Sequence, residues 1–102
     1  MIIKHKNEDF ALTLNLLDCQ NRLIRPENCE YMRFYVYTQN EDAKINLTVN
    51  QDNDIYVNGN EISMLENGTL KYVLEVGFKS DYYSDKQKDM IIRGETQIYF
   101  TD

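Results

Sequence analysis

The chain has 102 residues, of which 42% are hydrophobic, 27% charged and 12% aromatic, as is typical of one globular domain. Its net charge of −6 repels phosphate backbones and anionic membranes, so neither nucleic acid nor a membrane is expected as a partner. No apolar run approaches the roughly 20 residues that cross a bilayer, and no secretion signal is visible at the start. We expect a single domain over 1–102, made in a cytoplasm.

Apolar and polar residues alternate along most of the chain, which predicts strands rather than helices. Residues 1–7 are expected to form a flexible N-terminal arm. The long alternating runs at 9–17, 31–38, 43–50 and 69–78 predict strands. Shorter strands are expected at 23–24, 55–57, 90–92 and 95–101, a single helical turn at 62–66, and an exposed loop at 79–89.

The spacing of these segments predicts the fold class. About seven short strands, with turns every eight to twelve residues, are typical of an all-β, antiparallel two-sheet sandwich. The dipeptide Asn58-Gly59 predicts a hairpin turn after the strand at 55–57. A small barrel is the competing way to close the sheet, and the spacing alone does not exclude it.

The residues that could support catalysis do not form a recognisable set. His5 is the only histidine, lies in the expected N-terminal arm, and has no nucleophile near it in the sequence. Acidic pairs at 8–9, at 41–42, and at 52 with 54 all fall in expected turns. Acid–base catalysis needs a buried carboxyl, whereas carboxylates in turns are solvated. We therefore expect no enzymatic activity, no catalytic residue and no cofactor.

Part of a calcium-loop pattern starts at Asn50. Asp52, Asp54 and Glu61 occupy its third, fifth and twelfth positions. The sixth position is normally Gly, because the loop turns sharply there, but here it is Ile55 in an expected strand. We interpret these residues as a polar turn between strands and expect no metal site.

Cys19 and Cys29 lie on either side of a loop that contains Pro26. We expect two reduced thiols, packed as small apolar side chains, because no secretory route is evident. A disulfide between them would close a short loop and could add roughly 2–3 kcal/mol of stability, and it is the alternative.

Eight tyrosines and no tryptophan are the most informative feature of the composition. Several tyrosines fall on the polar side of expected strands, where they would provide a surface for a partner protein. The alternative is that tyrosine simply suits strands. The candidate partner-binding residues are Arg33, Tyr35, Tyr37, Tyr82, Tyr83 and Tyr99.

Several segments together suggest a family. They are NEDFALTL (7–14), LDCQN (17–21), RFYVYT (33–38), NGTLK (67–71) and FTD (100–102). Their order resembles the N-terminal β-sandwich modules of phage baseplate upper proteins, and similar small virion proteins of crAss-like and other Bacteroides phages. The resemblance implies an immunoglobulin-like sandwich that attaches fibres or decorations to a larger shell.

The chain departs from the fibre-protein plan because the sequence stops after the module, with no shaft or receptor-binding region. The resemblance therefore implies a capsid decoration or head-fibre anchor, made in the host cytoplasm and located in the virion. Its partners would be capsid, fibre or baseplate subunits, and a homo-oligomer is compatible with this role. Two alternatives are a baseplate-associated adaptor and a carbohydrate-binding sandwich whose tyrosines stack on sugar rings.

Overall fold

The computed structural model describes residues 1–18, 20–78 and 89–102. The elements in chain order are β1 (Ile2–His5), β2 (Phe10–Thr13), a 3₁₀ turn (Pro26–Asn28), β3 (Cys29–Tyr37), a 3₁₀ turn (Glu41–Ala43), β4 (Ile45–Leu47), β5 (Asp54–Val57), α1 (Gly59–Ile62), β6 (Gly68–Phe78) and β7 (Asp89–Thr101). The expected all-β class is confirmed. The loop expected at 79–89 lies outside the described residues, except for Asp89, which begins β7.

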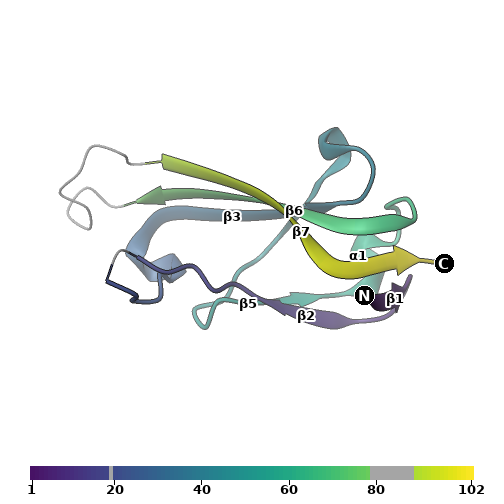
Figure 1. The fold of residues 1–102 in the computed structure, drawn as a ribbon, viewed down its shortest axis with the longest axis horizontal. Helices are drawn as coiled ribbons and strands as arrows, with labels where there is room; N and C mark the ends of the chain where they lie inside the picture. Colours follow the sequence, from purple (N-terminus) through teal and green to yellow (C-terminus); the bar gives the residue numbers. More distant parts are fainter. Residues whose placement is uncertain (19, 79–88) are drawn as a thin grey trace.

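Two sheets make up the fold. Five strands form one sheet in the order β1-β7-β6-β3-β4, and β2 and β5 form the other. In Figure 1 the two-stranded sheet lies beneath the larger one. The strand pairs are antiparallel except β1 with β7, which are parallel, so the expectation of a wholly antiparallel fold is wrong at this pair.

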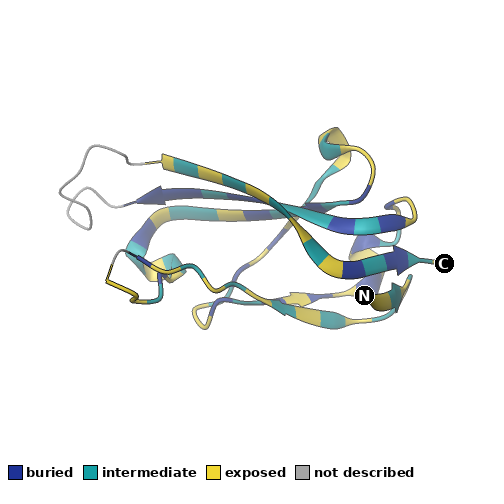
Figure 2. Cartoon of the chain, in the orientation of Figure 1, coloured by how far each residue is buried: buried dark blue, intermediate teal, exposed yellow. Residues whose placement is uncertain are grey.

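The core lies between the two sheets, where the inward residues of each strand meet (Figure 2). Strands place alternate side chains on opposite faces, so the period-two runs of β3 and β6 deliver their apolar residues to this one side. Burying each large apolar side chain contributes about 1.5–3 kcal/mol. The buried side chains include Phe34, Val36, Ile55, Val57, Leu70, Leu74, Val76, Ile98 and Phe100.

The expected flexible arm at 1–7 is replaced in the structure by strand β1. Residues Ile2–His5 pair in register with Ile98–Thr101 of β7. The turn that follows is fixed locally, because Asn7 has a φ of 72° and the Glu8 N–H donates to the His5 carbonyl. No signal near the N-terminus indicates this pairing, because the partner strand lies at the other end of the chain.

Two expected strands are shorter in the structure than the alternation predicts. The run 43–50 forms a strand only over β4, and the run 9–17 only over β2. Leu14 and Leu16 still turn toward the core and are half-buried, and Leu17 makes an isolated bridge with Leu23. The alternation therefore predicted that Leu14 and Leu16 face the core, but not that β2 ends before them.

Asn53 connects the turn before β5 to the segment after β2. Its side chain is fully buried, and its amide Nδ2 donates to the Ile24 carbonyl at 2.7 Å. Its own carbonyl accepts the Leu14 N–H at 2.8 Å, and its φ is 62°, a left-handed value that Asn tolerates better than most residues. One buried residue thus connects three separate segments, through its side-chain amide to Ile24 and through its backbone carbonyl to Leu14.

The hairpin predicted at Asn58-Gly59 is wrong, because these residues begin α1 instead. The Asn58 side chain accepts the Asn60 N–H as an N-cap, and the Asp9 carboxylate accepts the Gly59 N–H at 2.9 Å. A Cβ on Gly59 would overlap the backbone of Asn7, so glycine is needed here for a close approach rather than for a turn. Among the described residues, no helix is long and apolar enough to cross a membrane.

Candidate functional site

The outer face is the side of the five-stranded sheet that is turned away from β2 and β5. Three of its rows cross β3, β6 and β7 in register. The rows are Arg33–Glu75–Ile91, Tyr35–Val73–Arg93 and Tyr37–Lys71–Glu95. Arg33, Tyr35 and Tyr37, which the sequence singled out, therefore lie side by side on one surface.

Charged side chains lie over two tyrosine rings of this face. The Arg33 guanidinium lies 4.4 Å from the centre of the Tyr31 ring, and the Lys44 ammonium lies 5.2 Å from the centre of the Tyr35 ring. Arg33 also approaches Glu75 at 3.7 Å, and the Arg93 Nε donates to Glu41 at 2.9 Å. Cations stack favourably on aromatic faces, so the outer face is organised before any partner arrives.

Val73 lies in the middle of the outer face and is only 2% exposed. Its neighbours in the row are Tyr35 and Arg93, which both have longer side chains. In the sequence, Val73 between Lys71 and Glu75 predicts a strand residue on the outward side. Nothing in that pattern predicts that its side chain is buried there. The outer face is therefore a packed layer rather than a loose polar surface.

The Tyr31 side chain extends from β3 across Gly77 of β6 and reaches Asp89 of β7. It pairs with Gly77, whose missing side chain leaves room for the ring, and its hydroxyl donates to the Asp89 carboxylate at 3.2 Å. Partial burial and the Asp89 charge raise the pKa of the Tyr31 hydroxyl. An aromatic ring that covers a glycine across strands stabilises a sheet, which gives this tyrosine a structural role.

The remaining candidates are not brought to the same place. Tyr99 is half-buried on β7 beside Thr69 of β6 and Ile3 of β1, at the other end of the sheet. Tyr82 and Tyr83 lie outside the described residues. The structure thus groups three of the six candidates, places a fourth apart from them, and leaves two undescribed.

The side chains considered for catalysis or metal binding have structural contacts. The exposed His5 ring lies 3.1 Å from the Asp102 carbonyl. The Asn50 Oδ1 accepts the N–H groups of Asp52 and Asp54, as in an ordinary polar turn. No cluster of three or more metal-ligating side chains occurs in the part of the chain that the structure describes.

The Asp18 carboxylate is buried in a tight turn. It accepts the N–H groups of Gln20 and Arg22 and the Arg22 Nε–H, all within 2.9 Å. The backbone N–H of Arg22 lowers the pKa of Asp18 most, and the opposing effect of burial is smaller. Cys29 is also buried, with its thiol 3.5 Å from the Arg25 carbonyl, whereas Cys19 lies outside the described residues.

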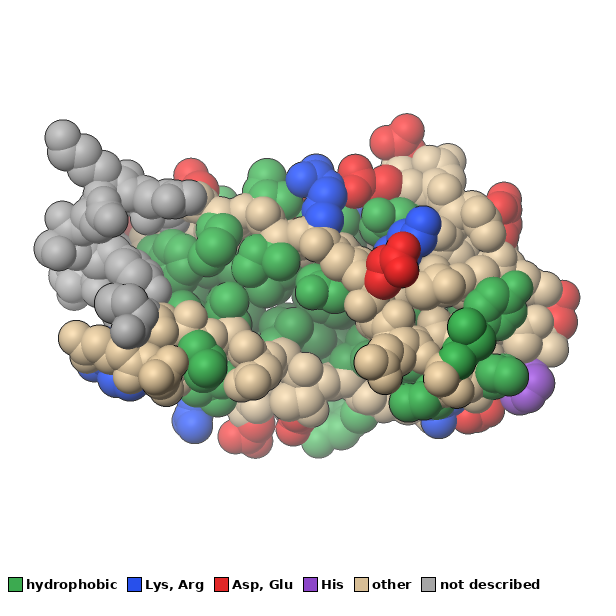
Figure 3. All heavy atoms as spheres, in the orientation of Figure 1, with side chains coloured by type: hydrophobic (Ala, Val, Ile, Leu, Met, Phe, Trp, Pro, Cys, Tyr) green, Lys and Arg blue, Asp and Glu red, His purple; other side chains and the backbone are tan. Residues whose placement is uncertain are grey.

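A hollow between the two sheets was not anticipated from the sequence. We call it the β7 cleft; its volume is about 220 Å³, and it is lined by Leu14, Asn15, Leu16, Tyr72, Leu74 and Ile92. Figure 3 shows the apolar side chains gathered in this hollow. The alternation predicted inward positions for most of them, but no pattern indicates that the described residues leave this space between the two sheets open.

No protein-family model, curated protein or solved structure matches this chain. The outer face and the β7 cleft are therefore described from the geometry of this chain alone.

Proposed function

We propose that this chain is a non-enzymatic structural protein of a phage particle, and that it binds another virion protein through the outer face. The observation that carries the proposal is the grouping of Arg33, Tyr35 and Tyr37 on one ordered surface. Tyrosine and arginine are favoured at protein contacts because they offer large, rigid areas with polar ends. The resemblance noted in the sequence favours a capsid decoration or head-fibre anchor, with a baseplate adaptor as its variant.

The order of strands supports an immunoglobulin-like plan for this module. The run β7-β6-β3-β4 corresponds to the G-F-C-C′ order of a variable-type sandwich, and β2 with β5 corresponds to its B–E pair. The chain departs from that plan in having no tryptophan and, among the described residues, only two strands in the second sheet. Such sandwiches present broad sheet faces, which suits a connector.

The charge of the chain supports assembly from a dispersed pool of subunits. A net charge of −6 favours soluble subunits and disfavours nucleic acid and membranes as partners. On the outer face, by contrast, Arg33, Lys44, Lys71 and Arg93 lie among the tyrosines. A mixed face of this kind favours a partner surface with complementary acidic and apolar positions.

The proposal is tested on particles of the source phage. Mass spectrometry of purified particles should detect this polypeptide, and its absence would end the proposal. In a phage encoding Tyr35→Ser together with Tyr37→Ser, incorporation should fall roughly tenfold, as expected when contact anchors are removed.

Tyr56→Ser is the matched control, because Tyr56 is 71% exposed on β5 in the other sheet and should leave incorporation unchanged. Far-UV circular dichroism establishes that each variant is folded. Equal losses in the two kinds of variant would show that the outer face is not the contact.

A carbohydrate-binding role has one observation in its favour. The exposed Tyr56 ring borders a shallow depression, together with Asp9, Ala11 and Asn58. Sugars stack on exposed aromatic rings while polar side chains bind their hydroxyls. A glycan array probed with the wild-type chain and with Tyr56→Ala separates this role from the first, since only a sugar-binding site loses signal in the variant.

A further inference from the structure

One edge of the large sheet is covered over only part of its length. Strand β1 pairs with β7 at Ile98–Thr101, on the side away from β6. On that same side, the backbone of 89–97 pairs with no other strand among the described residues. Figure 1 shows this half of β7 running along the outside of the sheet. An unpaired row of backbone N–H and C=O groups is a ready template for another strand.

The β7 cleft opens directly below this free edge. Ile92 points into it from β7, and Leu14 and Leu16 lie on the opposite wall. These three side chains are half-buried, unlike the fully buried core beside them. A strand added to β7 would place alternate side chains over the cleft and bury what is now partly exposed.

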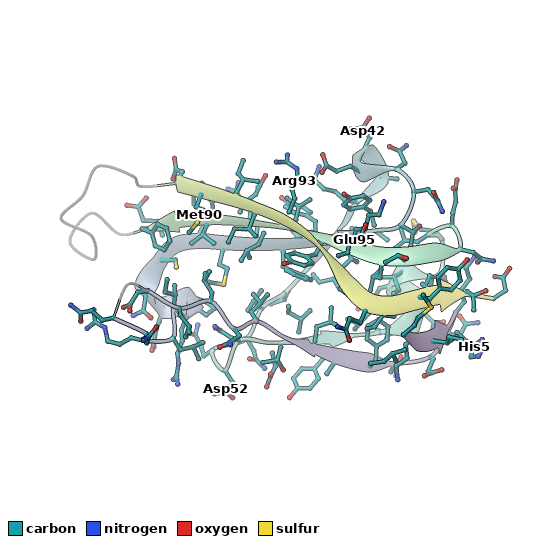
Figure 4. All side chains as sticks on the ribbon, viewed as in Figure 1. His5, Asp42, Asp52, Met90, Arg93 and Glu95 are labelled. Atoms are coloured by element: carbon teal, nitrogen blue, oxygen red, sulfur yellow. The ribbon has the colours of Figure 1, made fainter. Side chains whose placement is uncertain are left out.

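The outward side chains along the free edge include charges of both signs. In order they are Asp89, Ile91, Arg93, Glu95 and Gln97. Figure 4 shows Arg93 on the side of β7 that is turned toward the loop of Asp42. Glu95 makes no hydrogen bond or ion pair within the described residues, and the Arg93 guanidinium uses only its Nε–H, to Glu41. Arg93 therefore has further donors available.

Two copies of such an edge can pair about a two-fold axis only in certain registers. An axis at Arg93 places the Arg93 side chains of the two copies opposite each other, and an axis at Glu95 does the same with Glu95. Both registers bring like charges together. An axis at Ile92 sets Asp89 opposite Glu95, which also brings like charges together. An axis at Ile91 sets Asp89 opposite Arg93, which also attract, but it pairs only residues 89–93 of the described edge. An axis at Gly94 sets Arg93 of each copy opposite Glu95 of the other, so that both pairs attract, and it pairs the longer stretch 91–97.

We propose that this chain forms a homodimer in which the free halves of β7 pair antiparallel about a two-fold axis at Gly94. The five-stranded sheets then continue across the axis as one sheet, and the two β7 clefts open on to each other. Pairing runs from Ile91 to Gln97. Beyond it, Met90 and Asp89 of each copy have to diverge from the partner's edge, because β1 already occupies the positions beside Ile98 and Tyr99. This inference goes beyond the proposed function and does not depend on it, because it needs no virion partner.

The first test measures the association of the purified full-length chain. Sedimentation equilibrium over a wide range of concentration should show a monomer–dimer equilibrium. Amide hydrogen exchange within 91–97 should slow as the concentration rises, whereas exchange in β4, the other edge of the sheet, should not change. A chain that stays monomeric at every concentration, or that gains protection only at β4, overturns the proposal.

Charge reversal tests the register. Arg93→Glu and Glu95→Arg should each raise the dimer dissociation constant by roughly tenfold or more, because two cross-strand pairs become repulsive. The double variant should restore the wild-type constant to within about threefold, since the two pairs attract again with their signs exchanged. This register is contradicted if the single reversals leave the dimer dissociation constant unchanged. It is also contradicted if the double variant does not restore the wild-type constant.

Two controls separate the dimer contact from stability. Glu41→Gln removes the charge of the intrachain partner of Arg93 and should leave dimerisation unchanged. Arg33→Glu reverses another ion-paired, exposed arginine on the outer face, two strands away from the edge, and should also have no effect. If either control weakens the dimer as much as Arg93→Glu does, the edge contact is refuted. If the chain stays monomeric and 91–97 instead pairs with an extended segment of another virion protein, the homodimer is refuted and that segment is the occupant of the edge.

Discussion

The two halves of β7 have the same alternation and different surroundings. In the half beside β1, the inward side chains Ile98 and Phe100 are buried. In the half from Asp89 onward, the inward side chains Met90 and Ile92 stay half-buried beside the β7 cleft. The alternation determines which face a side chain occupies, but the neighbouring strands determine how completely it is buried.

The largest expected effect tests this contrast with the same substitution in each half. Ile98→Ala should lower the free energy of unfolding by about 3 kcal/mol, because it leaves a cavity in a closed core. Ile92→Ala should cost only about 1 kcal/mol, because the cleft already admits solvent. Urea unfolding of the two variants measures the difference. Equal losses would mean that the two halves of β7 are equally well packed.

Asn53 tests what holds the far wall of the cleft in place. Asn53→Ala should cost about 2–3 kcal/mol, because the buried Ile24 carbonyl loses its donor and alanine disfavours a φ of 62°. Asn53→Gly loses the same hydrogen bond without the backbone strain, so it should cost about 1 kcal/mol less. Thermal unfolding compares them, and equal costs would show that the backbone conformation contributes nothing.

Asp18 should make the stability of the fold sensitive to acid. Its folded pKa is lowered from the ordinary value of 3.8, so its contribution is present above that value and is lost as the pH falls further. Asp18→Asn should be less stable than wild type at pH 7, and its melting temperature should fall less steeply below pH 4. Parallel curves for the two proteins would contradict this assignment.

The smallest effect is expected at the outward side of the open half. Ile91 is 55% exposed, so Ile91→Thr should change the free energy of unfolding by less than about 0.5 kcal/mol. The comparison with Ile98→Ala then spans the full range of burial along one strand. A loss above about 1 kcal/mol would mean that other residues cover Ile91 in solution.

Most of the large sheet was predictable from the sequence. The run at 69–78 matches β6 almost residue for residue, and the run at 31–38 matches β3 apart from its start. Both strands are paired on two sides, so their residues meet a core on one face and a row of neighbours on the other. Under these conditions a period-two pattern specifies both the strand and its orientation.

The failures have a common physical cause, which is that pairing depends on residues far away in the sequence. The strand β1 carries no local signal, because only its register with β7 makes it a strand. Gly59 looked like a turn residue, but it is needed where the backbone of Asn7 passes close by. Of the candidate site, the face carrying Tyr35 and Tyr37 followed from alternation. The β7 cleft instead arises because no described strand pairs with β7 at 89–97, which alternation does not indicate.

The parallel pairing of β1 with β7 has a mechanical consequence. Because the strands run the same way, tension applied between Met1 and Asp102 pulls them past each other along their length. The hydrogen bonds between Ile2–His5 and Ile98–Thr101 are then loaded at the same time, rather than breaking one after another from one end. The terminal strands of this small domain therefore form a shear clamp, which resists stretching better than its overall stability alone would suggest.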